Sequence, residues 1–313
     1  MGSWAARRAH PTSIYVVGDV MVDVVVEATS PFSHGSDTPS VITTSPGGAA
    51  ANQSVAMARA GAHVALLGVV GDDPFGVAAA ASLEAAGVDV SLLLRSERST
   101  GVVVALVDAD GQRSMLTDRG ANLALEVAMV EALDTRLGAD DHVHISGYCL
   151  LDDESRAAGV RALELARLHG ASSSVDASSA GPLRAVGADR FLGWAQGADL
   201  LFCNEEEGTV LTSCAEPEAM ARRLAERADE VVVTLGASGA VVATRAGDVH
   251  RTAASEAHVG DTIGAGDGFT ATYLTRRLQG RRIDEALTDA VEAARQAVTR
   301  RGARAWASDY SRE

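Results

Sequence analysis

The 313-residue chain contains no lysine, and all 27 of its basic side chains are arginine. Chemistry that depends on a lysine amine is therefore excluded. This removes Schiff-base aldolases, pyridoxal-phosphate enzymes, NTPases with a GK[ST] loop and protein kinases with a strand lysine. If the protein handles ATP, it must hold the phosphates in another way.

Other absences narrow the class further. No apolar run approaches the roughly 18 residues of a membrane span, and no long apolar segment follows Arg7 and Arg8, so we expect no membrane partner and no signal peptide. The net charge is −15 and arginines are interleaved with acidic residues, so we expect no nucleic-acid partner. Three cysteines without CxxC spacing suit buried thiols in a reducing cytoplasm.

Strand-like and helix-like segments alternate along most of the chain. Apolar runs predict the strands, while helix caps and terminal glycines mark the helices. The predicted strands are 13–17, 64–70, 142–146, 172–176, 199–203 and 230–235, and the predicted helices are 49–60, 73–87, 125–137, 154–169, 218–227, 266–279 and 283–300. This alternation predicts one α/β domain over residues 1–313, with a mostly parallel central sheet and helices on both faces.

Two β-rich regions, about 20–45 and 98–118, interrupt the alternation. The second contains a hairpin that turns at 108–111. The two regions could pair into a small extra sheet beside the main one. Such a sheet over the edge of an α/β domain would form a lid, and lids exclude water from transferred phosphates.

The strongest motif is a small-residue run, Gly264-Ala265-Gly266, that leads through Asp267 into an apolar helix. Small residues let the backbone approach a ligand, and the amides at a helix N-terminus form an anion hole for phosphate. A carboxylate in the first turn could accept the proton of an attacking hydroxyl. Alone, the run is more often a glycine turn with a capping Asp. A dinucleotide fingerprint fails, because the preceding stretch is polar and Phe269 takes the third glycine position.

Two motifs in the N-terminal half suit a polyol. Gly47 and Gly48 at a helix start allow a sugar ring to lie against the backbone, and the Asn52 amide can donate to and accept from its hydroxyls. Asp23 lies near a strand end, where a carboxylate can bind vicinal hydroxyls, and it is a better candidate than Asp19. An ordinary loop-to-helix junction and solvated turn residues are the structural alternatives.

Three smaller patterns follow. Asn204 and Glu207 end a strand and could hold Mg²⁺ through water, or could simply begin an acidic helix. A turn with Thr234, Gly236 and Gly239 follows a buried strand and could line a nucleotide, or could be a hairpin turn. His142 and His144 alternate on one strand without an evident third ligand, so we interpret them as packed strand histidines.

Together these motifs resemble the ribokinase-like (PfkB) carbohydrate kinase family. The resemblance runs from Gly18 to about Gly302, with both family signatures in order: the block from Gly47-Gly48 through Asn52 to 71–76, and the block from Asp261-Thr262 to Asp267. The patterns at 204–207, 234–239 and 298–303 match as well. The family needs no P-loop lysine, in agreement with the composition.

The resemblance implies a kinase that transfers phosphate from ATP, with Mg²⁺, to a hydroxymethyl group of a sugar or sugar-like acceptor. Asp267 would be the general base, the 264–266 amides the anion hole, and 234–239 part of the ATP site. Many members hold K⁺ near 261–263 and 297–302, which makes Asp261 the candidate for a monovalent cation. A homodimer through the lid is common in the family.

The chain departs from ribokinases at three positions. Ribokinases carry Lys where this chain has Ala49, an acidic residue near Gly147, and an adenine-side Asn around Val291. The three departures therefore leave open whether ribose is the acceptor and which residues contact the adenine of ATP. The alternatives are a nucleoside kinase of the same fold, for which Phe32, Tyr148 and Phe191 could supply stacking, and a non-catalytic sugar-binding relative.

Overall fold

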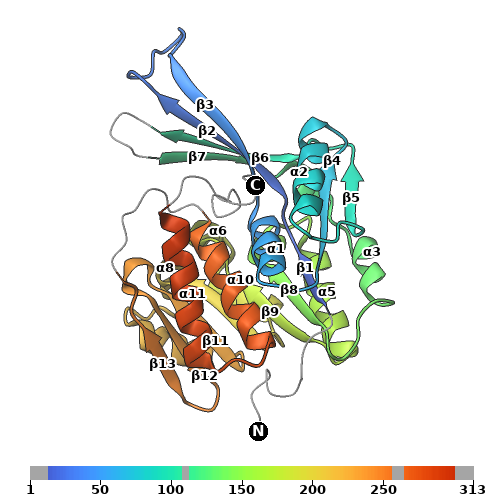
Figure 1. The fold of residues 1–313 in the computed structure, drawn as a ribbon, viewed down its shortest axis with the longest axis vertical. Helices are drawn as coiled ribbons and strands as arrows, with labels where there is room; N and C mark the ends of the chain where they lie inside the picture. The colour runs from blue at the N-terminus through green and yellow to red at the C-terminus, as the bar shows by residue number, and fades with distance from the viewer. Residues whose placement is uncertain (1–12, 108–112, 256–263, 300–313) are drawn as a thin grey trace, which may run out of the picture.

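The structure is a computed structural model that describes residues 13–107, 113–255 and 264–299. Its strands form two sheets (Figure 1). The large sheet has the order β13-β12-β11-β10-β9-β8-β1-β4-β5 and the small sheet the order β3-β2-β6-β7. The predicted α/β fold with a small additional sheet is therefore confirmed.

The large sheet is parallel over most of its width. Its strands are β1 (Ile14–Val17), β4 (Val64–Gly71), β5 (Leu93–Ser96), β8 (His142–Ser146), β9 (Ser172–Asp176), β10 (Leu200–Asn204), β11 (Glu230–Thr234), β12 (Ala240–Thr244) and β13 (Val249–Thr252). The edge formed by β12 and β13 is antiparallel. The alternation of strands and helices does not predict this edge, because β11, β12 and β13 follow one another without an intervening helix.

Helices cover both faces of the large sheet. One face packs against α1 (Ala49–Arg59), α2 (Pro74–Ala85), α10 (Ala265–Leu278) and α11 (Ile283–Val298). The other packs against α3 (Val127–Val130), α4 (Gly147–Leu151), α5 (Arg156–Leu168), α6 (Ala180–Val186), α7 (Ala188–Trp194), α8 (Glu205–Thr212) and α9 (Pro217–Leu224). Strand residues alternate between the two cores, as the two-residue period of a strand requires.

The predicted helix over 125–137 is wrong. The structure has only the short helix α3 and a 3-10 turn at Glu131–Leu133 in this stretch. The apolar residues Leu125, Val130, Leu133 and Leu137 are all buried, but they are spaced five, three and four residues apart. The chain thus buries these four residues with a short helix and a turn rather than with one continuous helix.

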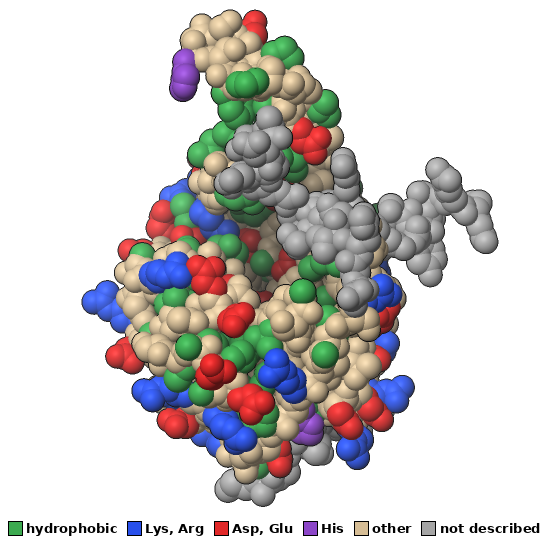
Figure 2. All heavy atoms as spheres, turned by 90° about the vertical axis from the view of Figure 1, so that its left-hand side faces the viewer, with side chains coloured by type: hydrophobic (Ala, Val, Ile, Leu, Met, Phe, Trp, Pro, Cys, Tyr) green, Lys and Arg blue, Asp and Glu red, His purple; other side chains and the backbone are tan. Residues whose placement is uncertain are grey.

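The small sheet begins shortly after strand β1 ends. Its strands are β2 (Met21–Ala28), β3 (Ser40–Gly47), β6 (Gly101–Val107) and β7 (Arg113–Asp118). They occupy the two predicted β regions, with β3 extending slightly further, to Gly47, and the 108–111 turn lies outside the described residues. The sheet projects from the body and carries exposed hydrophobic side chains (Figure 2). Among the described residues, no helix is long and apolar enough to cross a membrane.

Candidate active site

A cavity of about 210 Å³ lies where the carboxyl ends of several parallel strands meet the start of α10. Ligands of open α/β sheets bind at this edge, because the loops and helix N-termini there leave a crevice. The lining residues are Ala49, Asp176, Ser178, Phe202, Cys203, Asn204, Glu207, Thr234, Gly264, Gly266, Asp267 and Thr270. Six of the predicted site residues are thus brought together from segments far apart in the sequence.

Asp267 lies in the first turn of α10 and faces this cavity. The helix starts after Gly264, whose φ of 77° is in the left-handed region that glycine tolerates. The first amides of a helix have no partner within it, so Gly264, Ala265 and Gly266 bring N–H groups to the cavity edge. A Cβ atom added at Gly266 would meet no neighbouring atom within 4 Å outside its own helix backbone, so the backbone is open to the cavity there.

The carboxylate of Asp267 accepts two hydrogen bonds from α1. Asn52 Nδ2 donates to Oδ2 at 3.0 Å, and Gln53 Nε2 donates to Oδ1 at 3.2 Å. Burial raises the pKa of Asp267 well above its ordinary value, and the nearby carboxylate of Asp176 raises it further, while the Asn52 hydrogen bond acts against both. A general base with a raised pKa holds a transferred proton more strongly.

The start of α1 is fixed by Asp19. Its carboxylate accepts hydrogen bonds from the amides of Ala49 at 2.9 Å and Ala50 at 3.5 Å, and from the hydroxyl of Ser146 at 2.8 Å. Asp19 is therefore a buried anchor for the helix that carries Asn52. This role agrees with the preference for Asp23 as the acceptor-binding carboxylate.

Asp23 lies on β2, directly against the glycine pair. A Cβ atom added at Gly47 would overlap the Asp23 carboxylate, so the backbone and this side chain are in close approach. Gly48 follows and forms the N-cap of α1. The structure thus brings Asp23, Gly47 and Gly48 together at the base of the small sheet, one helical turn from Asn52.

Asn204 and Glu207 form a capping box at the start of α8. The Glu207 amide donates to Asn204 Oδ1 at 2.8 Å, and the Glu207 carboxylate accepts from the Asn204 amide at 2.9 Å and from Asn204 Nδ2 at 2.8 Å. Burial and the neighbouring Asp176 raise the pKa of Glu207 to about 7. Asn204 and Glu207 therefore begin an acidic helix, as one alternative predicted, and they also line the cavity.

The turn after β11 is only partly at the cavity. Thr234 lines it, whereas Gly236 and Gly239 are not among the described lining residues. Gly236 begins a 3-10 turn that connects β11 to β12, so this turn is the hairpin connection of the antiparallel edge. Asp261 lies outside the described residues.

Sequence reasoning missed several polar residues of the site, among them Asp176, Gln53, Ser178 and Thr270. Asp176, at the end of β9, accepts hydrogen bonds from Gln53 Nε2 at 2.9 Å and Thr270 Oγ1 at 3.2 Å. Burial raises the pKa of Asp176. The available signal was a polar residue that ends a buried strand, the same signal that selected Asn204. Gln53 had none, because it stands next to Asn52 in a run of small residues.

The interpretation of His142 and His144 as packed strand histidines is confirmed. Both are fully buried, and each has both ring nitrogens within 2.7 Å of a polar partner. In the described part of the chain, no group of three or more His, Cys, Asp or Glu side chains could hold a metal ion.

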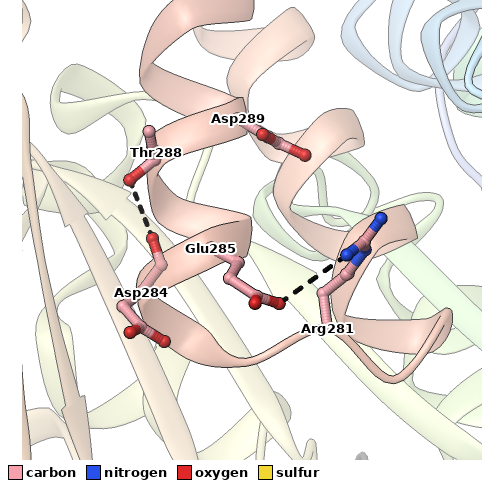
Figure 3. A pocket seen from close by; sticks show the side chains of 5 residues that line it. All are labelled: Arg281, Asp284, Glu285, Thr288 and Asp289. Carbon is pink, nitrogen blue, oxygen red and sulfur yellow. Dashed lines mark hydrogen bonds and ion pairs between the residues drawn. The ribbon is translucent and has the colours of Figure 1, made fainter.

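A second hollow, of about 420 Å³, lies on the surface at the start of α11 (Figure 3). It is lined by Arg281, Asp284, Glu285, Thr288 and Asp289. Thr288 Oγ1 donates to the Asp284 carbonyl at 2.9 Å, and Arg281 faces Glu285 at 4.0 Å. These are local contacts of an exposed helix start, and such surface ion pairs contribute little, so we assign no function to this hollow.

Comparison with known proteins agrees with this geometry. The family described as pfkB family carbohydrate kinase matches residues 11–309. The ribokinase of Schizosaccharomyces pombe is 28% identical over 309 residues, which cover 93% of each chain. The ATP-dependent ribose-1-phosphate kinase of Halopiger xanaduensis is 36% identical over 270 residues, which cover 81% of this chain and 83% of the relative.

A solved structure has the same architecture with ligands bound. The fructokinase from Vibrio cholerae O395, in its fructose-, ADP- and calcium-bound form, superposes with a TM-score of 0.77 at 28% identity. The match covers 93% of this chain and 94% of that one. The chain therefore belongs to the pfkB family of carbohydrate kinases, which are phosphotransferases with an alcohol group as acceptor.

Proposed function

We propose that this protein transfers the γ-phosphoryl group of ATP to a hydroxymethyl group of a sugar or related polyol, with Asp267 as general base. The observation that carries the proposal is the position of Asp267. Its carboxylate lies in the first turn of α10, at the cavity, and is held by Asn52 from the helix next to Asp23. One carboxylate thus stands between a helix N-terminus suited to phosphate and a group of residues suited to a polyol.

The reaction follows from this placement. Asp267 accepts the proton of the acceptor hydroxyl while the hydroxyl oxygen bonds to the γ-phosphorus. The bond from that phosphorus to the bridging oxygen breaks, and ADP leaves. Negative charge on the transferred group would be stabilised by the amides of Gly264, Ala265 and Gly266 and by the positive end of the α10 dipole. No lysine is needed for this arrangement.

Mg²⁺ fits the carboxylates of the cavity wall only as a water-mediated ion. Described residues form no three-ligand cluster, and Glu207 already accepts two hydrogen bonds from Asn204. Mg²⁺ in phosphotransferases commonly keeps several waters and is held largely by substrate phosphates. We propose that Glu207 holds such waters, and that the bound ion would neutralise phosphate charge. Thr234, with Gly236 and Gly239 beyond it, would line the nucleotide.

On the acceptor side, Asp23, Gly47, Gly48 and Asn52 are the proposed contacts. Ala49 lines the cavity at the position where ribokinases carry Lys, so an uncharged part of the acceptor would lie there. The small sheet stands beside this group of residues, and we propose that it is the lid of the single domain 1–313. The K⁺ site near Asp261 remains a prediction.

We also propose a homodimer through the small sheet. Its edge strands β3 and β7 carry exposed Val41, Ile42, Met115 and Leu116. Exposed edges and contiguous apolar side chains are features of association surfaces.

The free thiols of Cys149, Cys203 and Cys214 support the expectation of a reducing, cytoplasmic setting.

The deciding experiment measures ADP release with ATP and Mg²⁺ over a panel of pentoses, hexoses, sugar phosphates and nucleosides. A sugar or polyol with the highest kcat/KM supports the proposal. A nucleoside preference would replace the acceptor class while keeping the mechanism. ATP binding without phosphoryl transfer to any acceptor would contradict the proposal and favour a non-catalytic relative.

A further inference from the structure

A row of hydrogen-bonded, buried polar side chains leads from the site carboxylates into the centre of the large sheet. The row consists of Gln53 on α1, His144 and His142 on β8, and Ser174 and Ser172 on β9. All five are buried, on the sheet face that packs against α1 and α10 and where most neighbours are apolar. Polar groups in such a place cost stability unless they are hydrogen-bonded, so their contacts carry information.

Each link of this row is a short hydrogen bond. Gln53 Oε1 lies 2.7 Å from His144 Nε2, and His144 Nδ1 lies 2.7 Å from Ser174 Oγ. The same Ser174 oxygen lies 2.7 Å from His142 Nε2, whose other nitrogen lies 2.7 Å from Ser172 Oγ. The parallel register sets this spacing, because it pairs His142 with Ser172 and His144 with Ser174.

The directions of the hydrogen bonds follow from the carboxylates. Gln53 presents its NH₂ group to Asp267 at 3.2 Å and to Asp176 at 2.9 Å, and both are acceptors when ionised. Gln53 Oε1 must then accept, so His144 Nε2 carries the proton. Burial lowers the pKa of His144 to about 3, which keeps the ring neutral. Its Nδ1 therefore accepts from Ser174, and Ser174 accepts from His142 Nε2.

We propose that His144 is a positioning residue for the phosphoryl-transfer base: by donating to Gln53 Oε1, it holds the Gln53 amide in the one orientation that points two N–H bonds at Asp267 and Asp176. The inference rests on the proposed function. A rotation of the amide by 180° would place Oε1 against the two carboxylates and the NH₂ group against the His144 N–H. With its proton on Nε2, the neutral ring does not permit that exchange, because the proton would first have to move to Nδ1, which faces Ser174.

The charged groups around Asp267 make this orientation matter. Asp176 faces it from β9 and Asp19 acts from just beyond β1, and both favour the protonated form of Asp267, while Asp176 also raises the pKa of Glu207. The donors on Asp267 are the amides of Asn52 and Gln53. If the Gln53 amide were free to turn, a protonated Asp267 could donate a hydrogen bond to Gln53 Oε1. This would stabilise the protonated form, so Asp267 would stop acting as a base at a higher pH.

The test compares two histidines of the same strand. His144→Phe removes the donor to Gln53, whereas His142→Phe removes an equally buried ring whose nitrogens face Ser172 and Ser174. In His144→Phe we expect kcat at pH 7 to fall about 10-fold and the acidic limb of the kcat–pH profile to move up by about one pH unit. KM for ATP should stay within about 2-fold, because His144 is fully buried and does not line the cavity.

Two further variants define the result. In His142→Phe the acidic limb should stay in place, because Ser174 can still donate to His144. His144→Gln, whose amide can reach the same position as Nε2, should restore most of kcat and return the limb. Equal profiles for His144→Phe and His142→Phe would overturn the proposal, because the effect would then be one of packing.

A measurement on the unmodified protein covers the case in which the variants do not fold. In ¹⁵N-histidine NMR spectra of the full chain, His144 should show a protonated Nε2 and an unprotonated Nδ1 from pH 5 to 9. A charged ring or the opposite tautomer would overturn the inference. Failure of the wild-type enzyme on every acceptor would instead overturn the proposed function, and the tautomer would then decide the Gln53 orientation by itself.

Discussion

Asn52 Nδ2 donates to Asp267 Oδ2 at 3.0 Å, although the two residues are 215 positions apart. This contact joins the two halves of the family signature in one site, because α1 and α10 pack side by side on the same sheet face (Figure 1). It also gives Asn52 a second role beside the proposed contact with the acceptor.

Replacement of Asn52 by Ala should move the pH dependence of the reaction. Asp267 must be ionised to act as a base, so the rate falls as the pH drops through its pKa. The Asn52 hydrogen bond lowers that pKa, so the variant should lose activity at a higher pH than the wild type, and acceptor KM should rise. A kcat–pH profile checks this. Ser54→Ala, on the same helix, is the control, because the Ser54 hydroxyl donates to the Ala50 carbonyl.

Asp267 should also destabilise the ligand-free protein at high pH. Its pKa is raised in the folded state, so its contribution to stability is present below the unfolded-state pKa and is lost as the pH rises through the folded-state pKa. Asp267→Asn should therefore raise the free energy of unfolding at pH 8 by about 1 kcal/mol or more, and by less at pH 5.

Urea unfolding at the two pH values measures this difference. Asp72→Asn, which changes a carboxylate with 81% side-chain exposure, is the control and should have little effect at either pH. An Asp267→Asn variant that is less stable than the wild type at pH 8 would argue against a buried, charge-strained Asp267.

Much of this architecture could be predicted from the sequence. The strand and helix alternation gave the parallel sheet, and the glycine-rich run before Asp267 marked a helix start at a site. The pairing of Gln53 with Asp176 could not be predicted, because it depends on the spatial order β9-β8-β1 and on the packing of α1 across it. Likewise, the local sequence predicts the helix start at Asn204 and Glu207, but it does not predict that these residues share a cavity with Asp267.

Glu207→Gln should raise the Mg²⁺ concentration that the reaction requires. The substitution keeps the size of the side chain and a hydrogen-bonding group for the Asn204 cap, but removes the charge that would hold metal-bound water. We expect the apparent Mg²⁺ affinity at fixed ATP to fall about 10-fold, in line with outer-sphere ligands. Glu206→Gln, the exposed neighbour paired with Arg184, should leave the Mg²⁺ titration unchanged.

Charge placed on the small sheet should dissociate the proposed dimer. Ile42 and Leu116 are 61% and 58% exposed on the edge strands, so Ile42→Asp with Leu116→Asp should give a monomer with little loss of folding stability. Sedimentation velocity measures the change. Leu168→Asp, which alters a 69% exposed residue at the end of α5, is the control. A wild-type monomer at all concentrations would contradict the dimer.

The most direct test of the account is the single-turnover rate of Asp267→Asn with ATP, Mg²⁺ and the best acceptor of the panel. The isosteric amide keeps the shape of the site but cannot accept the hydroxyl proton. We predict a loss of about 10²–10⁴ in the rate of phosphoryl transfer with ATP binding retained. A rate within a few-fold of the wild type would contradict the assignment of Asp267 as the base.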